Sequence, residues 1–202
     1  GARESLFLEP DVAASVCARA KRFPGVLAVI LHMQQRAWAS GNAEALAAYA
    51  KDWEPGWLNV VEDPTAHLDG SDGPPIKVVA LVDPAVTSTE ALAADLALAA
   101  RGSAARAVTS SRRTAEVVHE AANKADGIRK ALKLAGIPGA PVVAFGDSGN
   151  DVEMLSSAAV GVAMGNCRAG ACEAALLRAD TNDTDAIADV IRKVVLAPGC
   201  PE

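Results

Sequence analysis

The sequence predicts a mixed α/β protein in two parts: an α+β region over residues 1–120, and a region over residues 121–202 with a Rossmann-like parallel sheet. From residue 124 onward, apolar runs of strand length alternate strictly with amphipathic helical stretches. Before residue 120, hairpin-like and helical stretches are mixed, which is typical of an α+β arrangement. The chain has 202 residues, of which 50% are apolar, so it can bury a core as one large domain or two small ones.

Helical spacing and capping residues predict three helices in the N-terminal region. In the first of them, Val12, Val16 and Ala20 fall on one face. Asn42, and either Ser88 or Thr87, stand where N-caps are favoured. The predicted helices cover residues 10–22, 41–53 and 88–102.

Short apolar runs predict the strands of the same region. VLAVIL and IKVVALV are continuous apolar runs, and AARAVTSS and TAEVVHE are typical of two short strands around Arg112 and Arg113. The Gly, Pro and Asp residues of 62–75 predict a loop. The predicted strands cover residues 26–31, 76–82, 104–111 and 114–120.

Strands and helices alternate with short links in the C-terminal region, which predicts a parallel sheet flanked by helices. The predicted strands cover residues 141–146 and 160–164, and the predicted helices cover residues 124–136, 151–158, 168–179 and 184–195.

The net charge indicates which partners the protein is expected to bind, and the cysteines indicate the cellular compartment in which it is expected. A net charge of −6 and a pI near 5.1 argue against a nucleic-acid partner, since phosphate backbones require a basic face. Every apolar run is too short for a membrane span, so no membrane partner is predicted. The four cysteines, Cys17, Cys167, Cys172 and Cys200, form no C-x-x-C pair, and we expect reduced thiols in a cytoplasmic protein.

The string G-D-S-G-N-D follows the apolar run VVAF and carries the clearest chemical signal. Asp147 falls at the end of the predicted strand, where ligands bind in open parallel sheets, and Asp151 falls in the first turn of the next helix. Gly146 and Gly149 allow a sharp turn between strand and helix. Mg²⁺ is commonly held by one or two carboxylates together with water and phosphate oxygens. The string therefore predicts a Mg²⁺ site.

The alternative is a helix capped by Ser148 or Asn150 whose acidic residues are only solvated. Two aspartates spaced four residues apart would not decide between the two interpretations. The complete string after a buried strand is more restrictive, and it favours the metal site.

These residues resemble a known family. FGDSGNDVEML followed by VGVAMGN resembles motif IV of the haloacid dehalogenase (HAD) superfamily, in its Cof-type phosphatase branch. Upstream, ANKADGIRKALKLAGI is similar to the lysine segment of that family. The resemblance is strong over residues 114–180. Residues 1–113 are similar only in architecture, to the α+β cap domain that these enzymes carry.

The resemblance implies a Mg²⁺-dependent phosphatase that acts on a small phosphorylated metabolite, such as a sugar phosphate, through an aspartyl-phosphate intermediate. By resemblance, Lys124 is a catalytic residue that contacts the phosphoryl group and the nucleophile, and Asn150 reaches a phosphate oxygen. The resemblance also implies that Asp147 binds Mg²⁺ directly and that Ser148 lies beside the metal. Asp151 binds the metal through water or orients Lys124.

The chain departs from the family at its first motif, an apolar strand that ends in D-x-D and supplies the nucleophile. HLDGSDG (67–73) lacks a preceding strand, and LVDPAV (81–86) lacks the second Asp. A Ser or Thr typical of the second motif is not found either. GARESLFLEP resembles the last core strand before the cap, and the chain begins with Gly1 instead of Met.

We therefore expect that the N-terminal part of the core is missing, because it was trimmed, lost in a gene model or removed by evolution. By itself the chain is then expected to lack the turnover typical of the family, and the alternative is a truncated pseudoenzyme or binding module. P-type ATPases share a related string, but the VAMGN continuation favours the phosphatases. Sucrose-phosphate phosphatases share G-D-S-G-N-D, so a sugar-phosphate substrate fits either branch.

Overall fold

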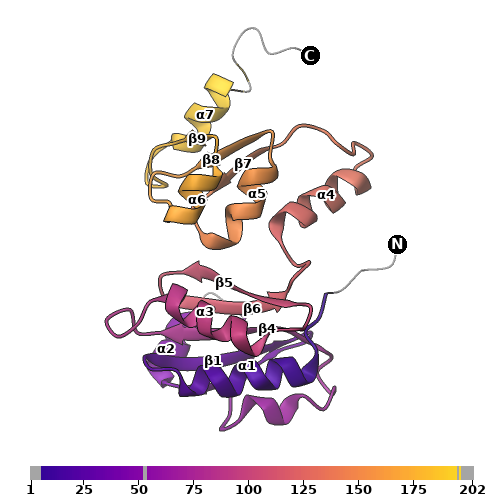
Figure 1. Ribbon diagram of the computed structural model, residues 1–202, viewed down its shortest axis with the longest axis vertical. Coiled ribbons are helices and arrows are strands. Elements are labelled where there is room, and N and C mark those ends of the chain that lie inside the picture. Colours follow the sequence, from indigo (N-terminus) through magenta and orange to yellow (C-terminus); the bar gives the residue numbers. More distant parts are fainter. Residues whose placement is uncertain (1–5, 52–53, 195, 197–202) are drawn as a thin grey trace. The chain divides into compact units, whose positions relative to one another are not determined.

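The computed structural model describes residues 6–51, 54–194 and 196 (Figure 1). The chain divides into two compact units, residues 1–122 (unit 1) and residues 123–202 (unit 2). The boundary expected from the sequence, between residues 120 and 121, lies two residues before this division.

Unit 1 contains a six-stranded sheet that is antiparallel except for its β2–β3 pair. The two longest strands, β1 and β4, lie at its centre, and Ile30 stands opposite Val79 across them. Their apolar runs are nearly continuous because side chains on both faces are buried here. Across the sheet the strands are β3 (Leu58–Val60), β2 (Ala37–Gly41), β1 (Val26–Met33), β4 (Pro75–Val82), β6 (Thr114–His119) and β5 (Ala105–Ser111).

Helices cover both faces of this sheet. α1 (Pro10–Arg22) and α3 (Thr89–Ala99) share one hydrophobic core with one face, in which Leu92 is fully buried. α2 (Ala43–Ala50) packs on the other face through Leu46. Full burial of a leucine side chain stabilises by roughly 1.5–3 kcal/mol, so these apolar contacts hold the helices on the sheet.

The capping residues expected from the sequence are confirmed. The Asn42 side chain accepts a hydrogen bond from the Ala45 amide at 2.9 Å, and Ser88 accepts one from the Ala91 amide at 3.1 Å. Ser88, not Thr87, is therefore the cap of α3. Each bond satisfies a backbone N–H that has no acceptor within its own helix.

Several elements of unit 1 depart from the prediction. β2 and β3 were not predicted, and the predicted loop at 62–75 contains a short 3₁₀ helix, η1 (Pro64–His67). The helix predicted at 41–53 ends earlier, at Ala50. β2 is a strand because its backbone pairs with β1 on one side and with β3 on the other. The five residues of β2 do not by themselves reveal this pairing.

Unit 2 contains a three-stranded parallel sheet in the order β7-β8-β9, as the alternation of strands and helices predicted. Short links join its elements, and its compact core includes Ala144, Leu155 and Ala171. In chain order the elements are α4 (Lys124–Leu134), β7 (Val143–Gly146), η2 (Gly149–Asp151), α5 (Val152–Ser157), β8 (Val160–Ala163), α6 (Ala169–Ala174), β9 (Leu177–Arg178) and α7 (Ala186–Val194).

The helix predicted at 168–179 is wrong in its second half. α6 ends at Ala174, Ala175 is extended, and Leu177 pairs with Val162 of β8. The amides of Leu176 and Ala179 donate to the carbonyls of Gly161 and Ala163, each at 2.9 Å. These hydrogen bonds to a distant strand outweigh the helical propensity of the alanine-rich sequence.

Within residues 6–51, 54–194 and 196, the longest helix has 13 residues, and none of the helices is both long and apolar enough to cross a membrane.

Candidate active site

Asp147 lies directly after β7, at the carboxyl end of the strand, as the sequence predicted. Its Oδ2 accepts a hydrogen bond from Nδ2 of Asn166 at 3.1 Å, and its Oδ1 accepts one from the Ser148 hydroxyl at 3.2 Å. Its backbone carbonyl accepts from the Arg168 amide at 2.8 Å. Both the backbone and the half-buried carboxylate of Asp147 are thus held in place by the loop that follows β8.

Asp151 is the buried carboxylate of the site, with 3% of its surface exposed. Its Oδ2 accepts hydrogen bonds from the amides of Asp147 and Ser148, both at 3.1 Å, and its Oδ1 lies 2.5 Å from Nζ of Lys124. Burial of a charge is costly unless the charge is paired and hydrogen-bonded. These three donors offset that cost and fix the turn between β7 and η2.

Gly146 makes room for Asp151. A Cβ atom at position 146 would lie 2.5 Å from Cβ and 2.8 Å from Cγ of Asp151, so any other residue would collide with that side chain. The first glycine of the G-D-S-G-N-D string, Gly146, is therefore required by the packing of the Asp151 side chain.

Lys124 is the first residue of α4, and the side chain of Asn123 caps this helix by accepting from the Asp126 amide at 2.8 Å. A cation at a helix N-terminus is disfavoured by the helix dipole. The ion pair with Asp151 compensates for this position, while about half of the Lys124 side chain stays exposed, at 51%. The ammonium is thus fixed by Asp151 and still accessible to a ligand.

The contacts described here connect four of the five residues singled out from the sequence: Lys124, Asp147, Ser148 and Asp151. Asn150 lies in η2 beside Asp151 and is half-buried. The residue that sequence reasoning missed is Asn166, which was quoted within VGVAMGN but given no role. It could have been found from topology, because the carboxyl ends of adjacent parallel strands meet at one edge of a sheet.

The donors at this edge fit a hard cation such as Mg²⁺. They are carboxylate and hydroxyl oxygens, which Mg²⁺ prefers, and one or two carboxylates suffice when water and phosphate oxygens complete the octahedron. Within the described part of the chain, no group of three or more His, Cys, Asp or Glu side chains is arranged to hold a metal ion. Asp151 is buried and already pairs with the ammonium of Lys124, whereas Asp147 is only half-buried, so Asp147 is the better placed direct ligand.

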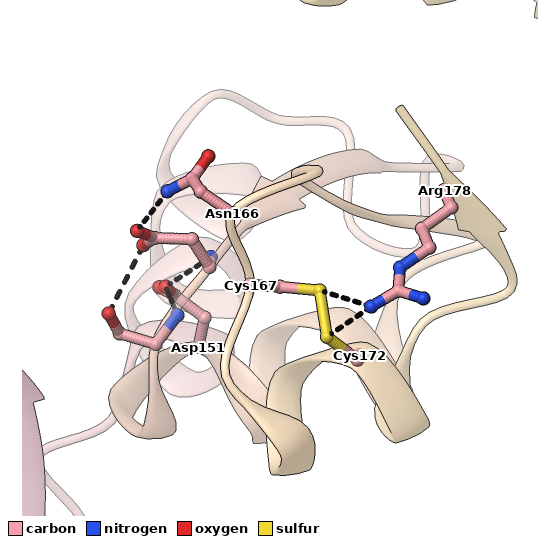
Figure 2. The surroundings of a disulfide bond; sticks show 7 residues. Asp151, Asn166, Cys167, Cys172 and Arg178 are labelled. Carbon is pink, nitrogen blue, oxygen red and sulfur yellow. Dashed lines mark hydrogen bonds between the residues drawn. A yellow bond between two sulfur atoms is a disulfide. The ribbon is translucent and has the colours of Figure 1, made fainter. Parts of the chain in front are cut away.

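The expectation of reduced cysteines is wrong for two of the four. Cys167 and Cys172 form a disulfide with their Cα atoms 5.6 Å apart, within the usual range for such bonds (Figure 2). α6 begins between them, and one turn of helix brings their side chains together. Cys17 is a free, fully buried thiol whose pKa is raised to about 12 by burial. Cys200 lies outside the described residues.

Comparison with known proteins identifies a family. The model of a family described as haloacid dehalogenase-like hydrolase matches residues 16–191. The chain is 45% identical over 73 residues to the 5-amino-6-(5-phospho-D-ribitylamino)uracil phosphatase YbjI of Escherichia coli, which covers 36% of this chain and 27% of that protein. It is 38% identical over 82 residues to the putative phosphatase YxeH of Bacillus subtilis, and the aligned segment covers 41% of this chain and 30% of YxeH. The aligned segments thus span less than a third of these curated relatives.

Solved structures share the fold at low sequence identity. The HAD subclass IIB sugar phosphatase BT4131 superimposes with a TM-score of 0.74 at 20% identity, covering 94% of this chain and 67% of that one. A haloacid dehalogenase-like hydrolase from B. subtilis superimposes with a TM-score of 0.75 at 16% identity, and the match covers 94% of this chain and 72% of the B. subtilis chain.

Proposed function

Because the chain belongs to the haloacid dehalogenase-like hydrolases, we propose that it forms the metal- and phosphate-binding part of a Mg²⁺-dependent phosphatase. The reaction is hydrolysis of a small phosphorylated metabolite, with a sugar phosphate as the leading class, through an aspartyl-phosphate intermediate. Family membership and the phosphatase names of the relatives favour an enzyme over a binding module.

One observation carries this proposal: a half-buried carboxylate at the carboxyl end of a parallel strand lies in one hydrogen-bonded network with a half-exposed lysine. The amide of Asp147 donates to Oδ2 of Asp151, whose Oδ1 pairs with Lys124. Phosphoryl transfer depends chiefly on positive charge held in place around the phosphorus, and a rigid network costs little reorganisation during reaction.

Each residue then has a role within this arrangement. Asp147 holds the metal directly, Ser148 lies beside it, and Asp151 acts on it through water while it orients Lys124. The ammonium of Lys124 and the side-chain amide of Asn150 contact the phosphoryl oxygens. Mg²⁺, when bound, supplies further positive charge to those oxygens.

The covalent nucleophile is not among the residues assigned here. The only D-x-D string of the chain, Asp183-Thr184-Asp185, lies in an exposed turn before α7 and is not at the end of a strand. We therefore expect that the chain alone hydrolyses phosphate monoesters far more slowly than is typical of its family.

We assign substrate choice to the cap domain, which we interpret as residues 1–120 and which makes up nearly all of unit 1. One structural neighbour is named a sugar phosphatase, and one relative is named for a phosphorylated ribityl compound, which supports a small phosphorylated metabolite. A cytoplasmic location suits such a substrate.

Calorimetric titration of the chain with Mg²⁺, and then with inorganic phosphate in the presence of Mg²⁺, tests the proposal. We expect weak binding of one metal ion, because water fills most of its coordination sphere. Asp147→Ala should abolish metal binding, and Lys124→Met should weaken phosphate binding while the metal still binds. The matched control is Asp189→Asn, which changes an exposed aspartate of α7 in the same unit.

Two outcomes would overturn the proposal. One is the absence of Mg²⁺ binding by the wild-type chain at millimolar concentration. The other is Mg²⁺ binding that Asp147→Ala leaves intact. Rapid Mg²⁺-dependent hydrolysis of p-nitrophenyl phosphate that Asp147→Ala abolishes would instead show that the chain contains its own nucleophile.

A further inference from the structure

Asn166 connects the Asp147 carboxylate to a part of unit 2 that the proposed reaction does not use. Its side-chain Nδ2 donates to Oδ2 of Asp147 at 3.1 Å, and its Oδ1 accepts from the Asn182 amide at 3.3 Å. Both ends of this exposed amide are therefore engaged. An amide held at both ends has a fixed orientation and presents its N–H to the carboxylate in one direction.

The backbone of the same loop is also tied to the site. The Arg168 amide donates to the carbonyl of Asp147 at 2.8 Å, and the Cys167 amide donates to the carbonyl of Met164 at 2.9 Å. Residues 164–168 thus hold Asp147 through its main chain and its side chain. A displacement of this loop would release both contacts together.

A disulfide closes this loop directly beside Asn166. Cys167 follows Asn166 in the chain, and its partner Cys172 lies in α6, whose Ala171 is buried in the core of unit 2 (Figure 2). The covalent bond therefore joins the loop that holds Asp147 to a helix anchored in the core. Both cysteines are only half-buried, so a small thiol can approach them.

Arg178 of β9 lies against both sulfur atoms. Its Nη2 is 2.8 Å from Sγ of Cys172 and 3.2 Å from Sγ of Cys167, and its side chain points from β9 toward the disulfide (Figure 2). A guanidinium beside a thiolate stabilises the negative sulfur. Stabilising the reduced form makes a disulfide easier to reduce. The surroundings of this bond thus favour a reversible pair over a permanent crosslink.

We propose that Asn166 is a positioning residue for the Asp147 carboxylate, and that the Cys167–Cys172 pair is a redox-sensitive lock on that residue. The oxidised pair holds residues 164–168 in place and keeps the metal site ordered, whereas reduction loosens the loop and weakens the metal site. The consequence for the metal rests on the role proposed above for Asp147. In a reducing compartment, protein disulfides are usually transient or redox-sensing, which agrees with this assignment.

The chemistry is thiol–disulfide exchange. A thiolate of a low-molecular-weight dithiol attacks one sulfur, the S–S bond breaks, and its electron pair passes to the other sulfur. The second thiol of the reagent then displaces the first cysteine, so that the protein gains two electrons and two protons and the reagent becomes a cyclic disulfide. The reverse reaction consumes an oxidised small disulfide and releases two thiols.

Two measurements on the chain, in oxidised form and after reduction with dithiothreitol, test the proposal. The first is the Mg²⁺ dissociation constant. We expect Asn166→Ala to weaken Mg²⁺ binding by about 10-fold or more, as is usual when a hydrogen-bond partner of a metal ligand is removed. Reduction should change the affinity in the same direction. The second is hydrogen exchange without metal, in which reduction should speed exchange at the Arg168 amide.

Matched variants separate the lock from general damage. The Cys167→Ser, Cys172→Ser double variant should resemble the reduced chain and should not respond to dithiothreitol, which also excludes effects through Cys17 or Cys200. Arg178→Gln should slow the reduction of the disulfide. Glu173→Ala, an exposed change on α6, should leave the Mg²⁺ affinity, the exchange of the Arg168 amide and the rate of disulfide reduction as in the wild type.

Each contrary result has a distinct meaning. Unchanged Mg²⁺ affinity in Asn166→Ala would overturn the positioning role. Unchanged affinity and unchanged Arg168 exchange on reduction would overturn the lock. If the oxidised wild-type chain binds no Mg²⁺, the proposed function fails, and the exchange measurement alone then decides for or against the lock.

Discussion

The Nζ atom of Lys124 lies 2.5 Å from Oδ1 of Asp151, and this contact joins the first turn of α4 to the turn after β7. The two partners differ in exposure, since 51% of the lysine side chain but only 4% of the aspartate side chain is accessible. The pair is thus anchored by its buried carboxylate and presents its cation outward. This asymmetry makes the two residues respond differently to substitution.

Asp151→Asn should lower the free energy of unfolding by about 1–3 kcal/mol, because a neutral amide accepts more weakly from the amides of Asp147 and Ser148 and leaves Lys124 without its anion. Urea denaturation measures the change. Asp189→Asn removes an exposed pair with Arg192 and should cost less than about 0.5 kcal/mol. Equal effects of the two substitutions would show that the buried network adds no stability.

Gly146→Ala should destabilise the chain by about 1–3 kcal/mol through overpacking and should also weaken Mg²⁺ binding, because its Cβ would collide with Asp151. Gly127→Ala is the matched control. Gly127 lies within α4 with open space around its missing Cβ, so alanine there should stabilise by about 0.5–1 kcal/mol. Denaturation and metal titration of both variants check the pair of predictions. A Gly146→Ala variant with wild-type metal affinity would contradict the packing argument.

His32 should make unit 1 less stable in acid. The residue is 4% exposed, its Nε2 lies 3.1 Å from the Tyr49 hydroxyl, and burial together with the charge of Lys77 lowers its pKa to about 3. An unfolded histidine has a pKa of about 6.5, so between these values only the unfolded state binds the proton. The contribution of neutral His32 to the free energy of unfolding is therefore complete above about pH 6.5. It decreases as the pH is lowered from about 6.5 toward about 3, by at most about 1.4 kcal/mol per pH unit.

Denaturation of the wild type and of His32→Gln across pH 4–7 isolates this contribution, since carboxylates titrate alike in both chains. The wild type should lose more stability than the variant as the pH falls. Parallel pH profiles would show that His32 does not titrate between the two states.

Leu92→Ala should cost about 2–5 kcal/mol, because the leucine is fully buried between α3 and the sheet and its truncation leaves a cavity. Leu98→Ala changes the same residue type on the same helix where it is 49% exposed, and should stay within about 0.5 kcal/mol of the wild type. Thermal denaturation of the two variants makes the comparison. Similar losses of stability in the two variants would contradict the packing of α3 on the sheet through Leu92.

Local patterns determined much of the fold. Helix 10–22 has the bounds that its apolar spacing predicts, and the caps Asn42 and Ser88 act as their residue types suggest. The position of Asp147 at the end of a strand was also readable, because an apolar run followed by glycines fixes a strand end locally. Helix periodicity and turn chemistry act within a few residues, so the sequence carries them directly.

Only the tertiary structure decided the features that depend on distant partners. The two-residue strand β9 exists because β8 supplies its hydrogen bonds, and an alanine-rich pattern had predicted helix there. The ion pair between Lys124 and Asp151 joins residues that are 27 positions apart in the sequence. The hydrogen bond between Asn166 and Asp147 joins residues that are 19 positions apart. Such contacts are set by how strands and helices pack, which no local pattern encodes.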